Sequence, residues 1–88
     1  MVKSAVLSDI VAPSGPLSAG SVGHVTGNAT NTGTESLTLY ADLMDYDTGG
    51  LVFRQGPMNT TIYSPIRSLD LTFTMPNRNF RWYISLHD

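Results

Sequence analysis

The sequence predicts an all-β fold, an antiparallel β-sandwich of about seven strands, formed by a single domain over residues 1–88. Apolar and polar residues alternate in several separate segments, as they do on the two faces of a pleated strand. Asn, Gly and Pro separate these segments at a spacing of about 8 to 12 residues, which is typical of sandwiches. No segment has the apolar periodicity of a helix, so the pattern favours strands throughout.

The first strand is expected over residues 3–11 and is followed by a loop over residues 12–20. Its alternation is imperfect because Ile10 and Val11 are both apolar, which indicates a bulge or an edge strand. The loop holds prolines, which cannot donate to a ladder, and glycines, which permit a reversal. Because an edge strand presents unpaired backbone groups, we expect this first strand to pair with another subunit or to detach for strand exchange.

The second strand is expected over residues 22–31 and has small residues on its inner face. Gly27 and Ala29 alternate with polar residues there. Dense packing requires large side chains opposite small ones. Trp82 is therefore expected to fill the space beside Gly27 and Ala29.

Three later segments alternate clearly, and two shorter ones are assigned to sheet edges. The clear strands are expected over residues 37–44, 68–75 and 79–87, and the short ones over residues 51–54 and 60–63. Each clear strand has one apolar face, which is expected to pack against the second strand. The residues expected at the centre of the core are Val25, Ala29, Leu39, Leu43, Leu71, Phe73, Trp82 and Ile84.

The composition argues against several classes of function. The formal net charge is −2, whereas nucleic-acid binding requires a basic surface. Arg67, Arg78 and Arg81 fall in the last quarter of the chain and leave a local basic patch as an alternative. The absence of cysteine excludes disulfides and thiolate chemistry. No stretch approaches the ~18 apolar residues of a membrane span, so no membrane insertion is expected.

The segment around Asp45 and Asp47 has two interpretations. Two carboxylates before Gly49 and Gly50 resemble the start of a calcium loop, but such a loop needs a glutamate near its end and none follows. A hairpin turn is favoured, in which Asp47 bonds its own backbone and Gly49 or Gly50 adopts a positive φ.

No catalytic grouping is visible in the sequence. His24 and His87 are the only histidines and lie on separate expected strands. A metal site needs three or four convergent ligands, and nucleophilic catalysis needs a positioned base. We therefore expect polar strand positions for both histidines, no metal, no cofactor and no enzyme activity.

The strings PLSAG at residues 16–20 and VTGNATNTGT at residues 25–34 resemble the immunoglobulin-like "cell-adhesion-related domain found in bacteria" (CARDB) and its archaeal and viral relatives. The string LDLTFTMP at residues 69–76 looks like the late strand of that family, which closes in proline. The resemblance covers residues 10–88. It implies an immunoglobulin-like sandwich of seven strands and a non-catalytic, surface-exposed module, and it supplies no catalytic residues. Gly27 and Ala29 depart from the more β-branched second strand of the family.

The solvent-facing positions of the expected strands carry residue types that are enriched at protein interfaces. Charged residues make up only 14% of the chain, against about 25% in typical soluble domains. Such a surface packs against a partner at little desolvation cost. We expect an oligomer or a docked subunit whose interface includes Tyr40, Met44, Tyr46, Arg81 and Tyr83.

The expected function is that of a non-catalytic structural or assembly module. The first hypothesis is a small structural protein of a virion, in the capsid, a decoration or the tail, made in the cytoplasm. The initiating Met and the lack of a signal peptide favour it. The alternative is a domain excised from a longer secreted adhesion protein, which would be extracellular. A third hypothesis is a carbohydrate-binding module with Tyr40, Tyr46 or Tyr83 as its platform.

Overall fold

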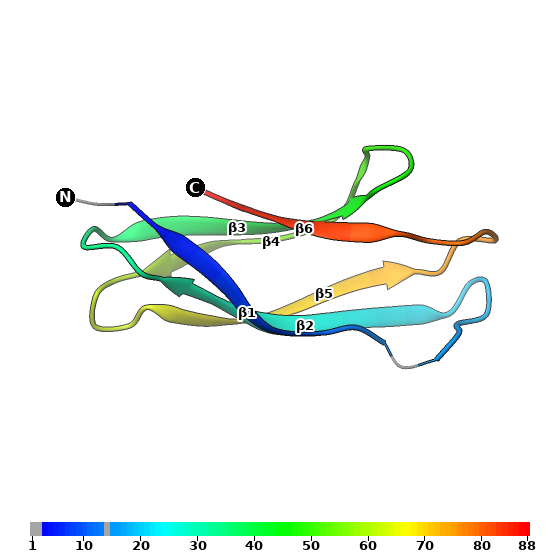
Figure 1. Ribbon diagram of the computed structural model, residues 1–88, viewed down its shortest axis with the longest axis horizontal. Helices are drawn as coiled ribbons and strands as arrows, with labels where there is room; N and C mark the ends of the chain where they lie inside the picture. Colours follow the sequence, from blue (N-terminus) through cyan, green and yellow to red (C-terminus); the bar gives the residue numbers. More distant parts are fainter. Residues whose placement is uncertain (1–2, 14) are drawn as a thin grey trace.

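The computed structural model describes residues 3–13 and 15–88 (Figure 1). These residues form two three-stranded antiparallel sheets and contain no helix. One sheet has the strand order β1-β2-β5 and the other has the order β4-β3-β6. The all-β architecture of two sheets is confirmed, and the described residues contain six strands where about seven were expected. The strands are β1 (Ala5–Val11), β2 (Val22–Asn31), β3 (Leu37–Asp45), β4 (Leu51–Thr60), β5 (Ile66–Thr74) and β6 (Trp82–His87).

Five of the six strands begin and end within three residues of their expected bounds. Three of them, β3, β5 and β6, alternate clearly in the sequence because each has one face toward the other sheet. Among the described residues, none belongs to a helix that could cross a membrane.

β4 is one strand where two short strands were expected, over residues 51–54 and 60–63, so that expectation is wrong. Residues 61–64 form a loop. Gly56 and Pro57 interrupt the strand pattern between residues 54 and 60. β4, however, lies at the edge of its sheet, where a proline facing solvent removes no ladder hydrogen bond. The pairing of β4 with β3 shifts its register beside these two residues.

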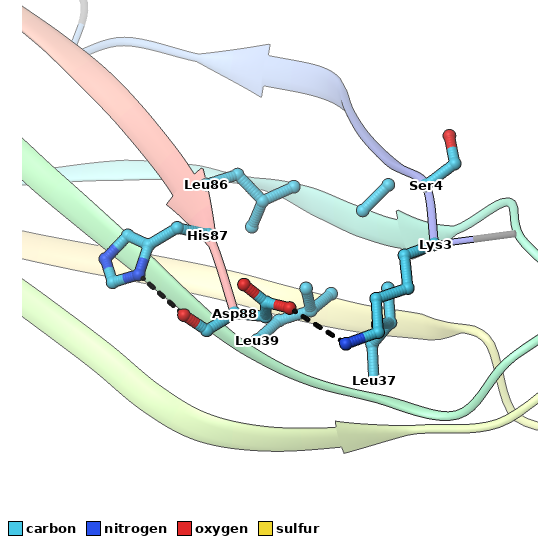
Figure 2. A pocket seen from close by; sticks show the side chains of 8 residues that line it. Lys3, Ser4, Leu37, Leu39, Leu86, His87 and Asp88 are labelled. Carbon is cyan, nitrogen blue, oxygen red and sulfur yellow. Dashed lines mark hydrogen bonds and ion pairs between the residues drawn. The ribbon is translucent and has the colours of Figure 1, made fainter.

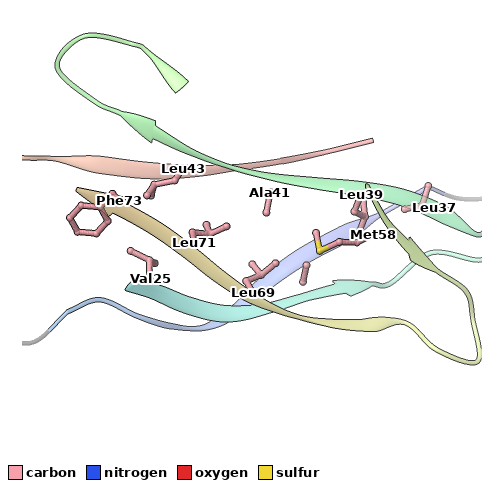
Figure 3. Close-up of a cluster of buried hydrophobic side chains, with 10 residues drawn as sticks. Val25, Leu37, Leu39, Ala41, Leu43, Met58, Leu69, Leu71 and Phe73 are labelled. Carbon is pink, nitrogen blue, oxygen red and sulfur yellow. The ribbon is translucent and has the colours of Figure 1, made fainter. Parts of the chain in front are cut away.

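The core lies between the two sheets, and Figure 3 shows its side chains pointing into this space. Six of the eight residues expected at its centre are buried, which confirms them. Trp82 and Ile84 are only half-buried, so their central placement is wrong. Both belong to β6, which lies at a sheet edge and leaves them partly uncovered. The buried apolar residues are Val25, Ala29, Leu37, Leu39, Ala41, Leu43, Met58, Leu69, Leu71 and Phe73.

Ile10 fills the space beside Gly27. Trp82 was expected there, so that expectation is wrong. A Cβ added to Gly27 would lie 2.4 Å from Cδ1 of Ile10. The expected bulge in β1 is confirmed and explains this contact, because the register of β1 on β2 shifts here and Asp9 has a φ of 54°. The extra residue redirects the chain and turns Ile10 toward β2.

Gln55 joins the two sheets along one side of the sandwich. Its side-chain nitrogen donates to the carbonyl oxygen of Ser68 at 2.9 Å, and its side-chain oxygen accepts from the N–H of Asp70 at 2.8 Å. Ser68 and Asp70 belong to β5, the edge strand of the other sheet. The amide of Gln55 therefore occupies backbone groups that an edge strand otherwise leaves without a protein partner.

Candidate interaction surface on β3 and β6

The outward face of β3 and β6 brings together residues that were expected at an interface. Leu39 and Leu43 are buried between the sheets, so the alternate residues Tyr40 and Met44 of β3 face outward. β6 pairs antiparallel with β3 and places Tyr83 directly opposite Met44. Tyr40 and Met44 are half-buried, whereas Tyr83 is 43% exposed. Whether this face is an interface stays a prediction.

Four residues at one end of this face form what we call the Tyr46 cluster: Tyr46, Asp47, Arg81 and Tyr83. The rings of Tyr46 and Tyr83 meet edge to face, with centroids 6.2 Å apart. The guanidinium of Arg81 lies 4.9 Å from the centroid of the Tyr46 ring, and its Nε donates to Oδ1 of Asp47 at 3.1 Å. The backbone N–H of Tyr46 donates to the carbonyl of Arg81 at 2.8 Å. Side-chain and backbone contacts thus fix the positions of two exposed aromatic rings.

Asp42 lies at the centre of a charged network on the same face. Its carboxylate accepts two hydrogen bonds from Arg54, at 2.7 and 2.9 Å, and its Oδ2 lies 2.8 Å from Nε2 of His87. Although Asp42 faces outward, it is only 5% exposed because these two side chains cover it. The two-point contact with Arg54 is the strong geometry for a carboxylate and a guanidinium.

The network changes the acid–base behaviour of its members. The hydrogen bond from Arg54 holds the pKa of Asp42 below its ordinary value of 3.8, against the opposing effect of burial. The hydrogen bond to Asp42 raises the pKa of His87 above its ordinary value of 6.5. Contact with the same carboxylate also raises the pKa of Arg54. Each shift favours the charged form of its group, because each group gains a hydrogen-bonded partner of opposite charge.

Tyr40 belongs to this network and not to the exposed cluster. Its ring stacks on His87, with centroids 5.5 Å apart and planes 19° apart. The guanidinium of Arg54 lies 5.6 Å from the Tyr40 ring centroid. Tyr40 therefore covers the Asp42 network, while Tyr46 and Tyr83 remain available to a partner.

The turn between β3 and β4 is organised by Asp45, whereas Asp47 was expected to bond the backbone there. Oδ1 of Asp45 accepts from the N–H groups of Asp47 and Thr48, at 3.0 and 3.3 Å. Gly49 has a φ of 73°, which confirms the expected positive φ. Within residues 3–13 and 15–88, no group of three or more His, Cys, Asp or Glu side chains is arranged to hold a metal ion.

The three late arginines do not form a free basic patch. Arg78 forms ion pairs with Asp45 and Asp47, and Arg81 forms one with Asp47. The side chain of Arg67 donates to the carbonyl of Ile66. The acidic residues of the β3–β4 turn thus offset two of the three positive charges.

The Asp42 network could not be recognised in the sequence. Asp42, Arg54 and His87 meet only because β4 and β6 pair with β3 in particular registers, and 45 residues separate Asp42 from His87. The histidine expectation is confirmed, since His87 and His24 both occupy polar strand positions. His24 lies on the opposite sheet, with its Nδ1 2.8 Å from Oδ1 of Asp70.

Comparisons of the chain with protein-family models, with curated proteins and with solved structures find no match. The resemblance to CARDB domains is carried by the strings at residues 16–20, 25–34 and 69–76 alone.

Proposed function

We propose that this chain is a non-catalytic assembly module, an immunoglobulin-like sandwich related to CARDB domains, that binds a protein partner through the Tyr46 cluster. The supporting observation is the edge-to-face pair of Tyr46 and Tyr83, which are 61% and 43% exposed. Tyr and Arg are the residue types most enriched at the energetic centres of interfaces. Rings that are already fixed lose little conformational entropy on binding, which favours affinity.

The biological setting that we propose is a virus particle, with the chain as a small capsid, decoration or tail protein made in the cytoplasm. A surface with few charges and fixed aromatic side chains suits packing in such an assembly. A domain of a secreted adhesion protein is the alternative setting, and the CARDB resemblance supports it. The genes that neighbour the reading frame separate the two, because capsid or tail genes favour the first and an encoded signal peptide with further repeats favours the second.

Carbohydrate binding is a second candidate function, and the same cluster supports it. Tyr46 and Tyr83 offer aromatic surface, and Asp47 and Arg81 beside them offer hydrogen-bonding groups. Sugar sites commonly combine apolar surface with a few convergent polar groups. A broad glycan array distinguishes the two functions. Binding to a defined glycan that is lost in Tyr46→Ala supports the second candidate, and no binding excludes it.

A photo-crosslinking experiment tests the assembly function in the cell that produces the protein. A photoreactive phenylalanine analogue is placed at Tyr83, within the Tyr46 cluster, and in a matched control at Tyr63. Tyr63 is 89% exposed but lies on the β4–β5 loop, outside the cluster. We expect adducts with one defined protein from position 83 and none from position 63, and we expect Arg81→Ala to reduce them. Equal adducts from both positions, or none from position 83, would contradict the proposal.

A further inference from the structure

Each of the two sheets has two edge strands, and the edge formed by β6 differs from the other three. Within the described residues, β1 is interrupted by the bulge at Asp9, β4 contains Pro57, and β5 is bonded by the side chain of Gln55. These are devices by which natural sheets prevent pairing with another chain. β6 pairs with β3 without a register shift and contains no proline, lysine or arginine.

The backbone groups that β6 leaves unpaired can be assigned from its ladder. The N–H of Tyr46 donates to the carbonyl of Arg81, so Arg81 directs its polar backbone groups toward β3. These directions alternate along an antiparallel strand. Trp82, Ile84 and Leu86 therefore direct their N–H and C=O groups away from β3, toward the open edge. The side chains of the same three residues face the core and are half-buried.

Two hollows lie at opposite ends of this open edge, between β6 and the first strand with its following loop. The first has a volume of about 210 Å³ and is lined by Lys3, Leu39 and Leu86, which Figure 2 shows around it. The second has a volume of about 180 Å³ and is lined by Phe80 and Trp82. β1 and β6 do not pair with each other, so the core is only partly covered along this side.

We propose that β6 pairs antiparallel with β6 of a second copy of this chain, about a two-fold axis at Ile84. This register lets all three residues with outward backbone groups pair, because Ile84 meets its own copy and Trp82 meets the second copy's Leu86. A two-fold axis perpendicular to the sheet keeps the core-facing faces of the two β4-β3-β6 sheets on the same side of the joined sheet. Each Trp82 then lies over the partner's first hollow, beside Leu86, and each Leu86 lies over the partner's second hollow, beside Trp82.

The edge of β6 is thus complementary to itself, which is the property that a two-fold interface requires. Three features of this edge fit β6 of a second copy as the partner. The apolar residues fall in register, the outward backbone groups can pair, and the two hollows have similar volumes. The pairing makes one six-stranded sheet from β4, β3 and β6 of both copies. The inference rests on the proposed assembly function, but it uses the edge of β6, where Tyr83 is the one member of the Tyr46 cluster.

A pair of charge variants tests the register on the outer face, where Tyr83 lies opposite the second copy's Ser85. Tyr83→Lys with Ser85→Lys places like charges across the axis twice. Tyr83→Glu with Ser85→Lys places opposite charges there and changes the same two positions. We expect a concentration-dependent dimer of the unmodified chain by sedimentation equilibrium. We expect the first variant to dimerise at least about tenfold more weakly than the second. Circular dichroism checks that both variants are folded.

Single cysteines give a second test, because the chain has none of its own. Residues 83 and 85 face each other across the axis as a pair without backbone hydrogen bonds, where Cα atoms approach to about 4.5 Å. That spacing allows a disulfide. Under mild oxidation we expect Tyr83→Cys mixed with Ser85→Cys to form a linked dimer at least about tenfold faster than either variant alone.

Several outcomes overturn the self-pairing. These are a monomer at every concentration, equal dimerisation of the two charge variants, or cross-linking as fast in the single variants as in the mixture. A monomer that still yields photo-adducts with another protein from position 83 overturns this inference while leaving the proposed function intact. A dimer with the expected cross-links but no adduct to another protein supports the inference and restricts the assembly to copies of this chain.

Discussion

The side-chain oxygen of Gln55 accepts a hydrogen bond from the backbone N–H of Asp70 at 2.8 Å, so one residue of β4 takes the place of a strand beside β5. The side-chain nitrogen of Gln55 donates to the carbonyl oxygen of Ser68, two residues before Asp70. A side-chain amide has the donor and the acceptor of a peptide group, which explains why a glutamine suits this position. The sandwich is therefore bridged on the side of β4 and β5 and open on the side of β1 and β6.

Replacing Gln55 by alanine is expected to weaken this bridge. Gln55→Ala removes the two hydrogen bonds to β5, and the free energy of unfolding in urea should fall by about 1 to 2 kcal/mol. Hydrogen exchange at the amide of Asp70 should become faster. Asn59→Ala is the control, because Asn59 is another β4 amide, is exposed, and accepts from the Thr38 hydroxyl of its own sheet and not from β5. Unchanged exchange at Asp70 in Gln55→Ala would show that the bridge has no role in solution.

The core predicts a sharp contrast between two neighbours in β5. Leu71 is fully buried, whereas Thr72 faces outward and is half-buried. Leu71→Ala should reduce the free energy of unfolding by about 2 to 5 kcal/mol, because it removes buried methyl groups and leaves a cavity. Thr72→Ala should change it by less than about 0.5 kcal/mol. Similar losses for the two variants would mean that β5 is placed in the wrong register.

The contact of Asp42 with His87 predicts a stability that depends on pH. The pKa of His87 is raised above its ordinary 6.5 in the folded chain. The contribution of protonated His87 to the free energy of unfolding is therefore complete below pH 6.5. It is lost as the pH rises through the pKa of His87 in the folded chain. The pKa of Asp42 is lowered below its ordinary 3.8, so its contribution is complete above pH 3.8 and is lost as the pH falls through the lower value.

Urea unfolding at a series of pH values checks this prediction. We expect His87→Asn to remove the decline above pH 6.5 and to retain much of the decline in acid, where Arg54 still pairs with Asp42. High salt should reduce the effect, since the His87 side chain is 39% exposed. His24→Asn, on the opposite sheet, is the matched control. A decline above pH 6.5 that persists in His87→Asn would assign it to another group.

Gly23 is buried in β2 and has no room for a side chain. A Cβ at this position would lie 2.4 Å from Cζ of Phe73 and 2.9 Å from Cδ1 of Leu17. Gly23→Ala should therefore reduce the free energy of unfolding by about 1 to 3 kcal/mol through overpacking. Adding Phe73→Leu should restore part of the loss, because the smaller side chain leaves space. If the changes in the free energy of unfolding caused by Phe73→Leu and Gly23→Ala were simply additive in denaturant unfolding, the two residues would not be in contact.

Residues 37–44 and 68–75 could be predicted as strands from the sequence because each has one buried face, so the alternation reports burial directly. β4 was predicted only in part, because Gly56 and Pro57 interrupt the pattern at an edge where the sheet tolerates them. Trp82 was placed too deep, because burial depends on whether a strand has neighbours on both sides. Such neighbours are set by the whole topology and not by local alternation.

For the candidate site, residue types were predictable and contacts were not. Tyr46, Arg81 and Tyr83 were identified because interfaces favour such side chains on polar strand faces. The bonds of Asp42 depend on the registers of two strand pairings, and alternation specifies the face of a residue without specifying its cross-strand neighbour. Arg54 and His87 therefore lacked any signal that joined them to Asp42.

Lys3 and Asp88 form an ion pair at 3.7 Å, which places the two ends of the described chain side by side. In Figure 1 the C-terminus lies toward one end of the long axis and the β3–β4 turn lies toward the other. The domain extends about 45 Å along this axis. If the domain were tethered through either terminus, the turn that carries Tyr46 would therefore point away from the point of attachment. A dimer through β6 would reverse that direction in one of its two copies, since antiparallel strands run in opposite directions. Because Tyr83 directly precedes Ile84 at the proposed axis, the pair would hold its two Tyr46 clusters close together at its centre, with the termini of the two copies on opposite sides of the axis.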